Sequence, residues 1–377
     1  MSNLYIDEIH SLGNDNGRGN LLGIQPYMVA SDYAAEEPFY AKLDGYLQSA
    51  RQEGWLGERT VVVWPELIGA WLVAAGESQR VFQARTIHAA MRPLVLRHAI
   101  PFAGKLAFAR EKDRVVASLF RMKAGQMAHL YQAVFSRLAR QYGVTVVAGS
   151  IYLPVPYVEE GLVRAGGGTG SAGRGYRSAG RGYRSADGGY STAGGYSSTG
   201  GLFNTSVVFR PDGQAHSTLV RKCYPIATEQ GFVSAASVAD LPVFETPAGK
   251  LGVLVCADSW YPQAYEQLKE GGVEMVAVPS LAAGAGIWEK PWGGYISADC
   301  PQDVDRKDVG RLTEGQAWRK YALSARIGAS GARCGVNVFL HGELWDLGVD
   351  NGNSLAVREG EIVEARKNGG ALLNVWL

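Results

Sequence analysis

The sequence has few cysteines, no excess of charge and no long apolar run. Its four cysteines are spread over 377 residues without a CxxC pair, which argues against a zinc site and against a disulfide framework. The formal net charge of +1 gives no overall attraction to nucleic acid or to a membrane. No uncharged apolar run approaches the roughly 18 residues that a membrane span needs. The first residues lack the basic and apolar regions of a secretory signal, so we expect a cytoplasmic protein.

Apolar residues, in contrast, make up 46% of the chain, which is enough to form a sizeable core. Short runs rich in Val, Ile and Leu alternate with stretches of helical period, and this alternation favours a layered α/β fold over an all-β one. The expected strands include 60–66, 144–154, 251–256 and 273–280, and the expected helices include 38–52, 126–143 and 314–329.

A low-complexity insert rich in Gly, Ser, Tyr and Arg occupies residues 164–201 and contains the repeat SAGRGYR twice. Such sequence cannot bury enough apolar surface to order itself, so we interpret it as a flexible surface insert between two strands. The alternative is a scaffold or RNA-binding protein whose insert stacks on RNA or contacts a partner. The four arginines of the repeat are few for that task, and no nucleic-acid partner is expected.

A basic amphipathic segment is the second unusual region, at about 76–125. Within it, residues 80–123 hold ten Lys or Arg against two acids, Glu111 and Asp113, with apolar residues interleaved. A stretch of this kind can lie on an anionic membrane surface. The alternatives are a solvated helix pair that flanks the core, or a contact between subunits. The sequence thus leaves a location peripheral to the membrane open.

Three chemically useful side chains stand at the ends of predicted buried strands. Glu66 follows VVVWP, Lys222 follows TLVR, and Cys256 is the expected last residue of LGVLVC. Ligands collect at the carboxyl ends of strands in α/β sheets. Each feature alone is weak, because a lone cysteine is more often a small core residue than a nucleophile. The order of the three, each inside an extended local pattern, is more specific.

With these motifs the chain resembles the nitrilase (carbon–nitrogen hydrolase) superfamily. The Glu–Lys–Cys triad of that family is matched by WPE, RKCYPIATEQGF and CADSWYP, and further matches are VVAGSIYLP, FNTSVVFRPDGQ, VEMVAVPS and GNSLAVREGEIV. The resemblance covers nearly the whole chain apart from the two unusual segments. It implies a single domain over residues 1–377 with an α/β fold, a four-layer α-β-β-α sandwich. It also implies pairing of subunits into a homodimer or a higher homo-oligomer.

The resemblance and the chemistry of amide hydrolysis together give each residue a role. Cys256 would be the nucleophile, with a nearby ammonium favouring its thiolate form, and Glu66 would be the general base. Lys222 would stabilise the oxyanion, with the backbone N–H of Ala257 as a second donor. The resemblance further suggests Glu229 as the carboxylate that orients Lys222, the alternative being an ordinary exposed glutamate.

The residues after the nucleophile bear on the reaction. Asp258 stands two positions beyond Cys256, and the Trp-Glu pair of nitrile-cleaving family members is absent, so amide hydrolysis is favoured. Nitrile hydrolysis and N-acyl transfer by the same triad stay open. The expected substrate is a small amide or nitrile, and no metal or cofactor is expected. Four aromatic residues are candidates for the pocket wall: Trp260, Tyr261, Trp288 and Trp292.

Overall fold

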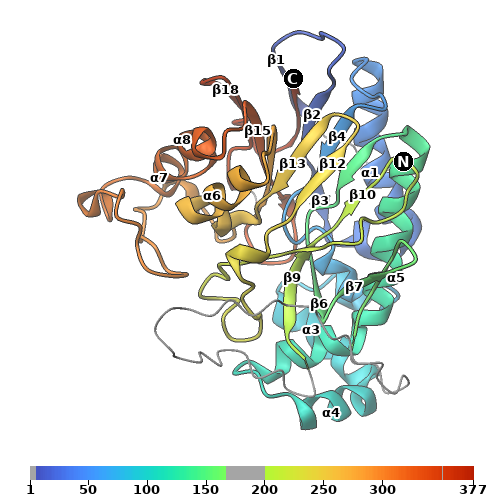
Figure 1. The fold of residues 1–377 in the computed structure, drawn as a ribbon. Coiled ribbons are helices and arrows are strands. Elements are labelled where there is room, and N and C mark those ends of the chain that lie inside the picture. Colours follow the sequence, from blue (N-terminus) through green and yellow to red (C-terminus); the bar gives the residue numbers. More distant parts are fainter. Residues whose placement is uncertain (1–5, 167–199, 350) are drawn as a thin grey trace, which may run out of the picture.

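Two six-stranded sheets lie face to face in the structure (Figure 1), a computed structural model that describes residues 6–166, 200–349 and 351–377. The first sheet has the order β1 (Ile6–Leu12), β19 (Gly370–Trp376), β2 (Asn20–Gln25), β4 (Thr60–Val63), β5 (Thr145–Val147), β10 (Val208–Phe209). The second has the order β12 (Val243–Thr246), β13 (Gly249–Val253), β14 (Met275–Ser280), β15 (Cys334–Phe339), β17 (Leu355–Arg358), β18 (Glu361–Glu364). The central strands β2, β4 and β5 run parallel, as do β13, β14 and β15. Within each sheet, the carboxyl ends of these strands therefore share one edge.

Smaller sheets extend this frame. A three-stranded sheet has the order β11 (Val220–Arg221), β9 (Leu202–Ser206), β6 (Ile151–Pro154), and two pairs are β16 (His341–Glu343) with β3 (Tyr27–Val29) and β7 (Tyr157–Glu159) with β8 (Leu162–Arg164). The prediction of one strand over 144–154 is wrong, because β5 and β6 belong to different sheets. The chain bends at Gly149, whose φ is +65° and where a Cβ would come within 2.0 Å of the Pro65 carbonyl oxygen. Only glycine suits that bend.

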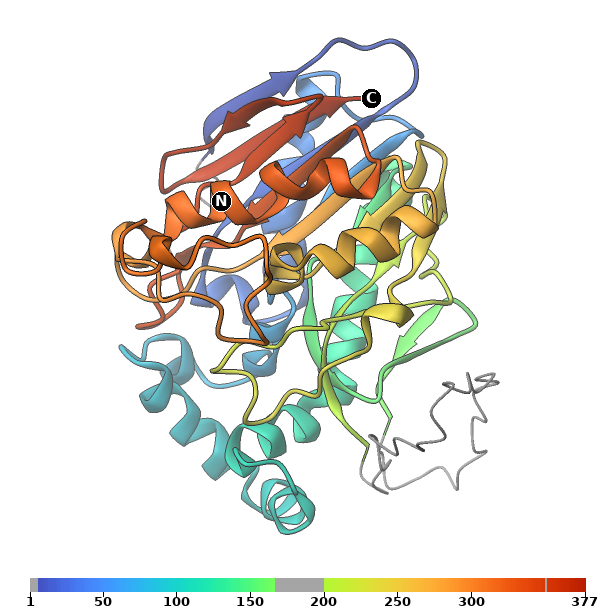
Figure 2. The same cartoon turned by 60° about the vertical axis from the view of Figure 1, so that its left-hand side comes forward.

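Helices cover the outer faces of both sheets (Figures 1 and 2). The helices against the first sheet are α1 (Glu36–Gln52) and α5 (Arg114–Tyr142), and those against the second are α6 (Pro262–Glu270), α7 (Glu314–Tyr321) and α8 (Leu323–Arg326). Alternate residues of a strand face opposite sides. Leu22 therefore packs in the cluster under α1 and α5, whereas Leu21 packs with Val276 between the sheets. This arrangement is the expected four-layer α-β-β-α sandwich.

The predicted basic amphipathic segment at 76–125 is helical and projects from one end of the sandwich, at the bottom of Figures 1 and 2. Its helices are α2 (Gln79–Phe82), α3 (Ile87–Arg97), α4 (Ala99–Phe108) and the first turns of α5. Short 3₁₀ helices complete the described elements: η1 (Ala30–Tyr33), η2 (Ala70–Ala74), η3 (Val238–Asp240), η4 (Cys256–Trp260), η5 (Ile287–Glu289), η6 (Arg306–Asp308) and η7 (Ile327–Ser330). Among the described residues, none of the helices combines the length and the apolar character needed to cross a bilayer.

The predicted insert at 164–201 lies mostly outside the described residues, but both of its ends are placed. The N–H of Gly166 donates to the Pro154 carbonyl over 2.9 Å. The N–H of Val155 donates to the Gly201 carbonyl, also over 2.9 Å. The two ends of the insert thus lie side by side at the end of β6.

Candidate active site

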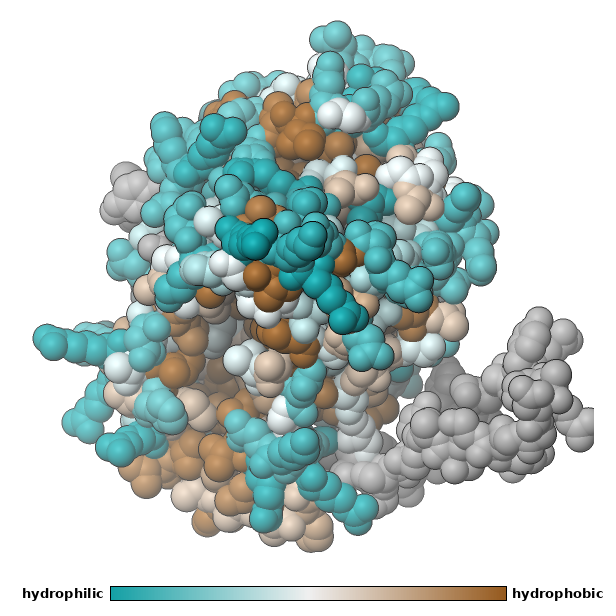
Figure 3. Space-filling view, turned by 90° about the vertical axis from the view of Figure 1, so that its left-hand side faces the viewer, coloured by the Kyte–Doolittle hydropathy of each residue, from teal (hydrophilic) through white to brown (hydrophobic). Residues whose placement is uncertain are grey.

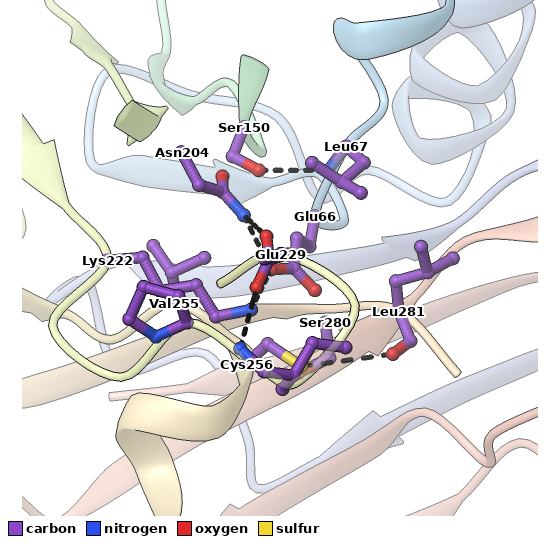
Figure 4. Close-up of polar contacts among 12 residues, drawn as sticks. Glu66, Leu67, Ser150, Asn204, Lys222, Glu229, Val255, Cys256, Ser280 and Leu281 are labelled. Carbon is purple, nitrogen blue, oxygen red and sulfur yellow. Dashed lines mark hydrogen bonds and ion pairs between the residues drawn. The ribbon is translucent and has the colours of Figure 1, made fainter. Parts of the chain in front are cut away.

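Glu66, Lys222 and Cys256 meet just beyond the ends of three strands from different sheets (Figure 4). Glu66 lies three residues after β4, and Lys222 directly follows β11. Cys256 opens η4, three residues after β13 ends at Val253, and its φ of 52° lies in the left-handed region. The prediction that Cys256 is the last strand residue is therefore wrong. The chain has already left the sheet when it reaches the sulfur, and the cysteine occupies a strained turn.

Lys222 is the centre of a buried ion cluster. Its Nζ donates over 2.7 Å to Oε1 of Glu66 and over 2.7 Å to Oε2 of Glu229, and its side chain has no exposed area. Glu229 also accepts from the backbone N–H of Ile226 at 3.0 Å. Glu229 is buried and bonded to Lys222, so it is not an ordinary exposed glutamate, and its role in orienting Lys222 stays a prediction.

Two further polar side chains complete the cluster, and neither was among the sequence-based candidates. The Asn204 amide, from β9, donates over 2.8 Å to Glu66 and over 2.8 Å to Glu229, so one group bridges both carboxylates. The Tyr152 hydroxyl, from β6, donates to Glu229 over 3.0 Å. The available signal for Asn204 was an amide within a short strand, LFNTS, since a buried polar group needs partners.

The sulfur of Cys256 lies against Glu66. The thiol and the Glu66 carboxyl group form a side-chain hydrogen bond, and Sγ is 3.8 Å from the Leu281 carbonyl oxygen. Only 4% of the cysteine is exposed. Glu66 therefore contacts both the sulfur and the Lys222 ammonium.

Burial dominates the protonation of this site. It raises the pKa of Glu66 against the opposing charge of Lys222. Burial, reinforced by the charge of Glu66, raises the pKa of the Cys256 thiol well above its usual value, and the ammonium of Lys222 offsets only part of this. Burial alone would lower the pKa of Lys222, but the two carboxylates raise it. The ammonium of Lys222 thus favours the thiolate, as expected, but burial and the charge of Glu66 outweigh it and keep the pKa of the thiol raised in the resting site.

The pKa of Glu229, in contrast, is lowered. Burial would raise its pKa, but the charge and hydrogen bond of Lys222, with the donors Ile226 and Asn204, lower it below the usual value. Two carboxyl groups that share one ammonium thus differ in proton affinity. Glu229 is therefore the carboxyl group favoured as a charged counter-ion, and Glu66 is the one that takes up a proton more readily.

The loop that carries Glu66 is held by the turn between β5 and β6. The N–H of Leu67, whose φ is 57°, donates to Oγ of Ser150 over 2.9 Å, and the N–H of Gly69 donates to the Ser150 carbonyl over 3.0 Å. The close approach of Gly149 to Pro65 adds to this contact. Backbone strain beside the carboxylate is thus supported by specific hydrogen bonds, as is common at functional sites.

Asp258 joins the segments that carry Cys256 and Lys222. Its Oδ1 accepts from the N–H groups of Cys223 and Tyr224, at 2.9 and 2.8 Å, and its Oδ2 accepts from the N–H of Val255 at 3.2 Å. Burial raises the pKa of this carboxyl group to about 7. Asp258 thus fixes the backbone next to both residues, and its supporting role in the reaction stays a prediction.

The four aromatic candidates for the pocket wall are all buried: Trp260, Tyr261, Trp288 and Trp292. Trp260 and Trp292 stack with their ring centroids 5.7 Å apart, and Trp260 meets Trp318 of α7 edge to face. Tyr261 stacks at 3.7 Å on Tyr224, two residues after Lys222. The tryptophans thus form an aromatic cluster beneath the outer helices, and a role in the pocket stays a prediction.

Within residues 6–166, 200–349 and 351–377, no three His, Cys, Asp or Glu residues come together in a way that could hold a metal ion. The buried groups of the site are instead matched to one another. An ammonium, two carboxylates, an amide and a hydroxyl form a hydrogen-bonded network beside a thiol. Such an arrangement can deliver a sulfur nucleophile, a proton acceptor and a fixed positive charge to one bound carbonyl group.

Comparisons with family models find a carbon–nitrogen hydrolase match over residues 185–296, which include Lys222 and Cys256. A second match, to an acetyltransferase (GNAT) domain, covers residues 56–148. That segment is fully described and contains the strands β4 and β5, parallel neighbours in the first sheet. It is therefore part of the sandwich. That residues 1–377 form one domain stays a prediction.

Among curated proteins, the chain is 31% identical over 113 residues to Nitrilase 2 of Arabidopsis thaliana. The match covers 28% of this chain and spans about a third of the length of that relative (33%). Solved structures of an amidase from Nesterenkonia sp. have the same fold. One of these structures aligns with 96% of this chain and with 90% of the amidase chain, at 15% identity and a TM-score of 0.51. An alanine variant of that amidase covers 97% and 92% at 14% identity and a TM-score of 0.52.

Proposed function

We propose that this chain, which belongs to the nitrilase superfamily, hydrolyses a carbon–nitrogen bond other than a peptide bond, converting an amide to an acid and ammonia or an amine. The observation that carries the proposal is the position of Glu66. One carboxyl group contacts the Cys256 thiol and the Lys222 ammonium in a buried site. Proton transfer and charge stabilisation can then act on the same carbonyl group.

In the first half-reaction, Sγ of Cys256 attacks the carbonyl carbon while its proton passes to Glu66. The Lys222 ammonium and the N–H of Ala257 stabilise the negative oxygen. Glu66 then gives the proton to the departing nitrogen, the C–N bond breaks, and an acyl thioester remains on Cys256. Because the thiol is protonated at rest, sulfur attack and proton transfer occur together.

In the second half-reaction, a water molecule attacks the thioester carbonyl, and Glu66 accepts a proton from that water. The C–S bond breaks, the acid leaves, and the sulfur recovers a proton from Glu66. Each proton taken up is returned, so the site ends the cycle as it began. Glu229 keeps its negative charge throughout and holds Lys222 in place.

Amides are favoured over nitriles because of the residues after the nucleophile and because of the structural neighbours. The position two residues beyond Cys256 is Asp258, whose carboxylate accepts three backbone N–H groups. The Nesterenkonia protein with the same fold is described as an amidase, and one of its structures holds butyramide. Small aliphatic amides are therefore the first substrates to test.

The experiment is a screen for ammonia release from short aliphatic amides, the matching nitriles and N-carbamoyl compounds. We expect turnover of amides that is abolished in Cys256→Ala and retained in Cys300→Ala, a partly exposed cysteine that serves as the matched control. Turnover of nitriles alone would overturn the amidase proposal. Turnover by Cys256→Ala would overturn the mechanism. Added hydroxylamine tests for the acyl thioester, because it should intercept that intermediate and form the hydroxamate in place of the acid.

A covalent probe tests the nucleophile without knowledge of the substrate. Acrylamide adds to the active-site cysteine in a variant of the Nesterenkonia amidase. We expect acrylamide to modify Cys256 of this chain, with the adduct located by peptide mass spectrometry. Modification of Cys300 alone, at the rate of a free thiol, would argue against an activated Cys256.

A further inference from the structure

The outward side of helix α4 is apolar. Ile100, Ala103, Gly104, Ala107 and Phe108 follow the spacing that places residues on one helix face, and all five are exposed. Ile100 is 88% exposed and Phe108 is 73% exposed. Leu96, near the end of α3, is 76% exposed and adds to them. We call these six residues the α4 face.

An apolar outward face is unusual, because helices on the surface of a globular protein place polar residues toward water. The opposite side of α4 is already used: Phe102 is buried, and Leu106 is partly buried against the core cluster. The α4 face is therefore a second apolar side of the same helix. Figure 3 shows hydrophobic residues gathered at the lower end of the molecule, where Figure 1 places α3 and α4.

Positive charge is exposed in the same segment as the α4 face. Five basic side chains of this region are exposed and have no ion pair within the described ranges: Arg80, Arg85, Arg92, Arg110 and Lys112. The two acids within residues 80–123 are engaged internally. Glu111 pairs with Arg121, and Asp113 caps α5 by accepting from the N–H of Val116 at 3.0 Å. The charge that remains outward is thus positive.

The same segment is connected to the candidate active site. The N–H of Asp113, between α4 and α5, donates over 2.8 Å to the carbonyl of Gly231, two residues after Glu229. Further along α5, Phe120 meets Tyr152 edge to face at 4.8 Å, and the hydroxyl of Tyr152 donates to Glu229. A surface bound by the α4 face would therefore lie next to the loop that carries Glu229.

We propose that the α4 face docks on an anionic lipid bilayer. An apolar helix face surrounded by Lys and Arg is the combination that binds membrane interfaces: the apolar side chains enter the boundary between headgroups and acyl chains, and the cations pair with acidic headgroups. An uncharged apolar partner would account for Ile100 and Phe108 but not for the exposed cations of the same segment. Charge complementarity therefore selects an anionic surface.

Co-flotation of the full chain with vesicles tests the proposal. Vesicles of phosphatidylcholine alone are compared with vesicles that also contain phosphatidylserine, at low and at high salt. We expect binding to the anionic vesicles only, weakened by salt. The double variants Ile100→Glu with Phe108→Glu, and Arg92→Glu with Arg110→Glu, should each lower the bound fraction about tenfold or more.

Two controls separate docking from other effects. Ile362→Glu, at an exposed isoleucine of the edge strand β18, should bind vesicles like the unmodified chain. Cys256→Ala should also bind normally, because docking does not depend on catalysis. Thermal unfolding of each variant checks that the fold is intact.

Two results would overturn the proposal. One is a lack of binding to the anionic vesicles, or binding that neither double variant changes. The other is self-association of the chain that Ile100→Glu with Phe108→Glu abolishes, without vesicle binding. In that case the occupant of the α4 face is a second copy of this chain.

Discussion

The Nζ atom of Lys222 lies 2.7 Å from Oε1 of Glu66, a residue 156 positions earlier in the chain. Both side chains are buried, so each would lose several kcal/mol of hydration free energy if it stood alone. Glu229 gives the ammonium a second partner, and the amide of Asn204 donates to both carboxylates. The cluster is thus stable only as a whole, and its members do not act independently on stability.

Removing the ammonium should therefore destabilise the protein strongly. Lys222→Met leaves two buried carboxyl groups without their cation, and we expect the free energy of unfolding to fall by about 3–5 kcal/mol, together with loss of activity. Urea denaturation measures the change. Lys250→Met removes a partly exposed lysine that pairs with Glu245 at 3.6 Å, and it should alter stability little. Equal effects of both substitutions would contradict a buried ion cluster.

The pH dependence of kcat/KM should report Glu66. The mechanism needs its carboxylate form, and burial raises its pKa above the ordinary value of 4.5. Activity should therefore rise with pH through one ionisation with a midpoint above that value. It should not rise again near the ordinary pKa of a thiol, because the protonated Cys256 gives up its proton during attack. A single rise with a midpoint near 9 would instead indicate a preformed thiolate.

Asn204 should influence the pH at the midpoint of the rise in kcat/KM. Its amide donates to the carboxylates, and such donation favours their charged form. Asn204→Ala should therefore move the acid limb of kcat/KM to higher pH and lower kcat, with KM changed less. Asn20→Ala, at an equally buried asparagine that bonds to Asn374 and Trp55, is the matched control. It should lower stability without moving the limb, and a shift in both variants would argue against a specific role.

Asp258 should affect stability in a pH-dependent way. Its pKa rises from 3.8 to about 7 on folding, so between these values the folded state holds a proton that the unfolded state has lost. This group therefore favours folding most at pH 4 or below, and its contribution declines as the pH rises toward 7.

The substitution Asp258→Asn tests this linkage. The new side-chain NH₂ group would face the N–H of Val255, so two hydrogen-bond donors would point at each other. We expect the free energy of unfolding to fall by about 1–3 kcal/mol. The difference in free energy of unfolding between the two proteins should shrink from pH 5 to pH 8. Denaturation at both pH values measures it. A difference that grows with pH would instead mean that Asp258 binds its proton less tightly in the folded state than in the unfolded one.

The sequence could locate the strand ends because runs of β-branched residues mark buried strands clearly. Glu66, Lys222 and Cys256 were found in this way. The backbone conformation at Cys256 could not be predicted, because nothing in the local sequence indicates that a cysteine has a left-handed conformation. The break between β5 and β6 had a sign in the Gly149–Ser150 pair, but apolar residues on both sides concealed it. The layer order came from family resemblance.

The bridging amide of Asn204 could not be predicted, for a geometric reason. A strand sequence tells which residues share a face, but not which residues of another sheet they meet. Asn204 lies on β9 and Tyr152 on β6, and their contact with Glu229 depends on how the three-stranded sheet sits beside the first sheet. Such long-range relations are set by packing of the whole fold.

The hydrogen bonds that bring Gly166 and Gly201 together beside Val155 make this a natural insertion point for protein engineering. Because the entry and exit of the chain are already adjacent, a folded reporter domain with neighbouring termini can replace the intervening residues without stretching the sandwich. The length of the replacement changes the entropy of closure only slowly. Fusions of quite different size should therefore keep the same catalytic core.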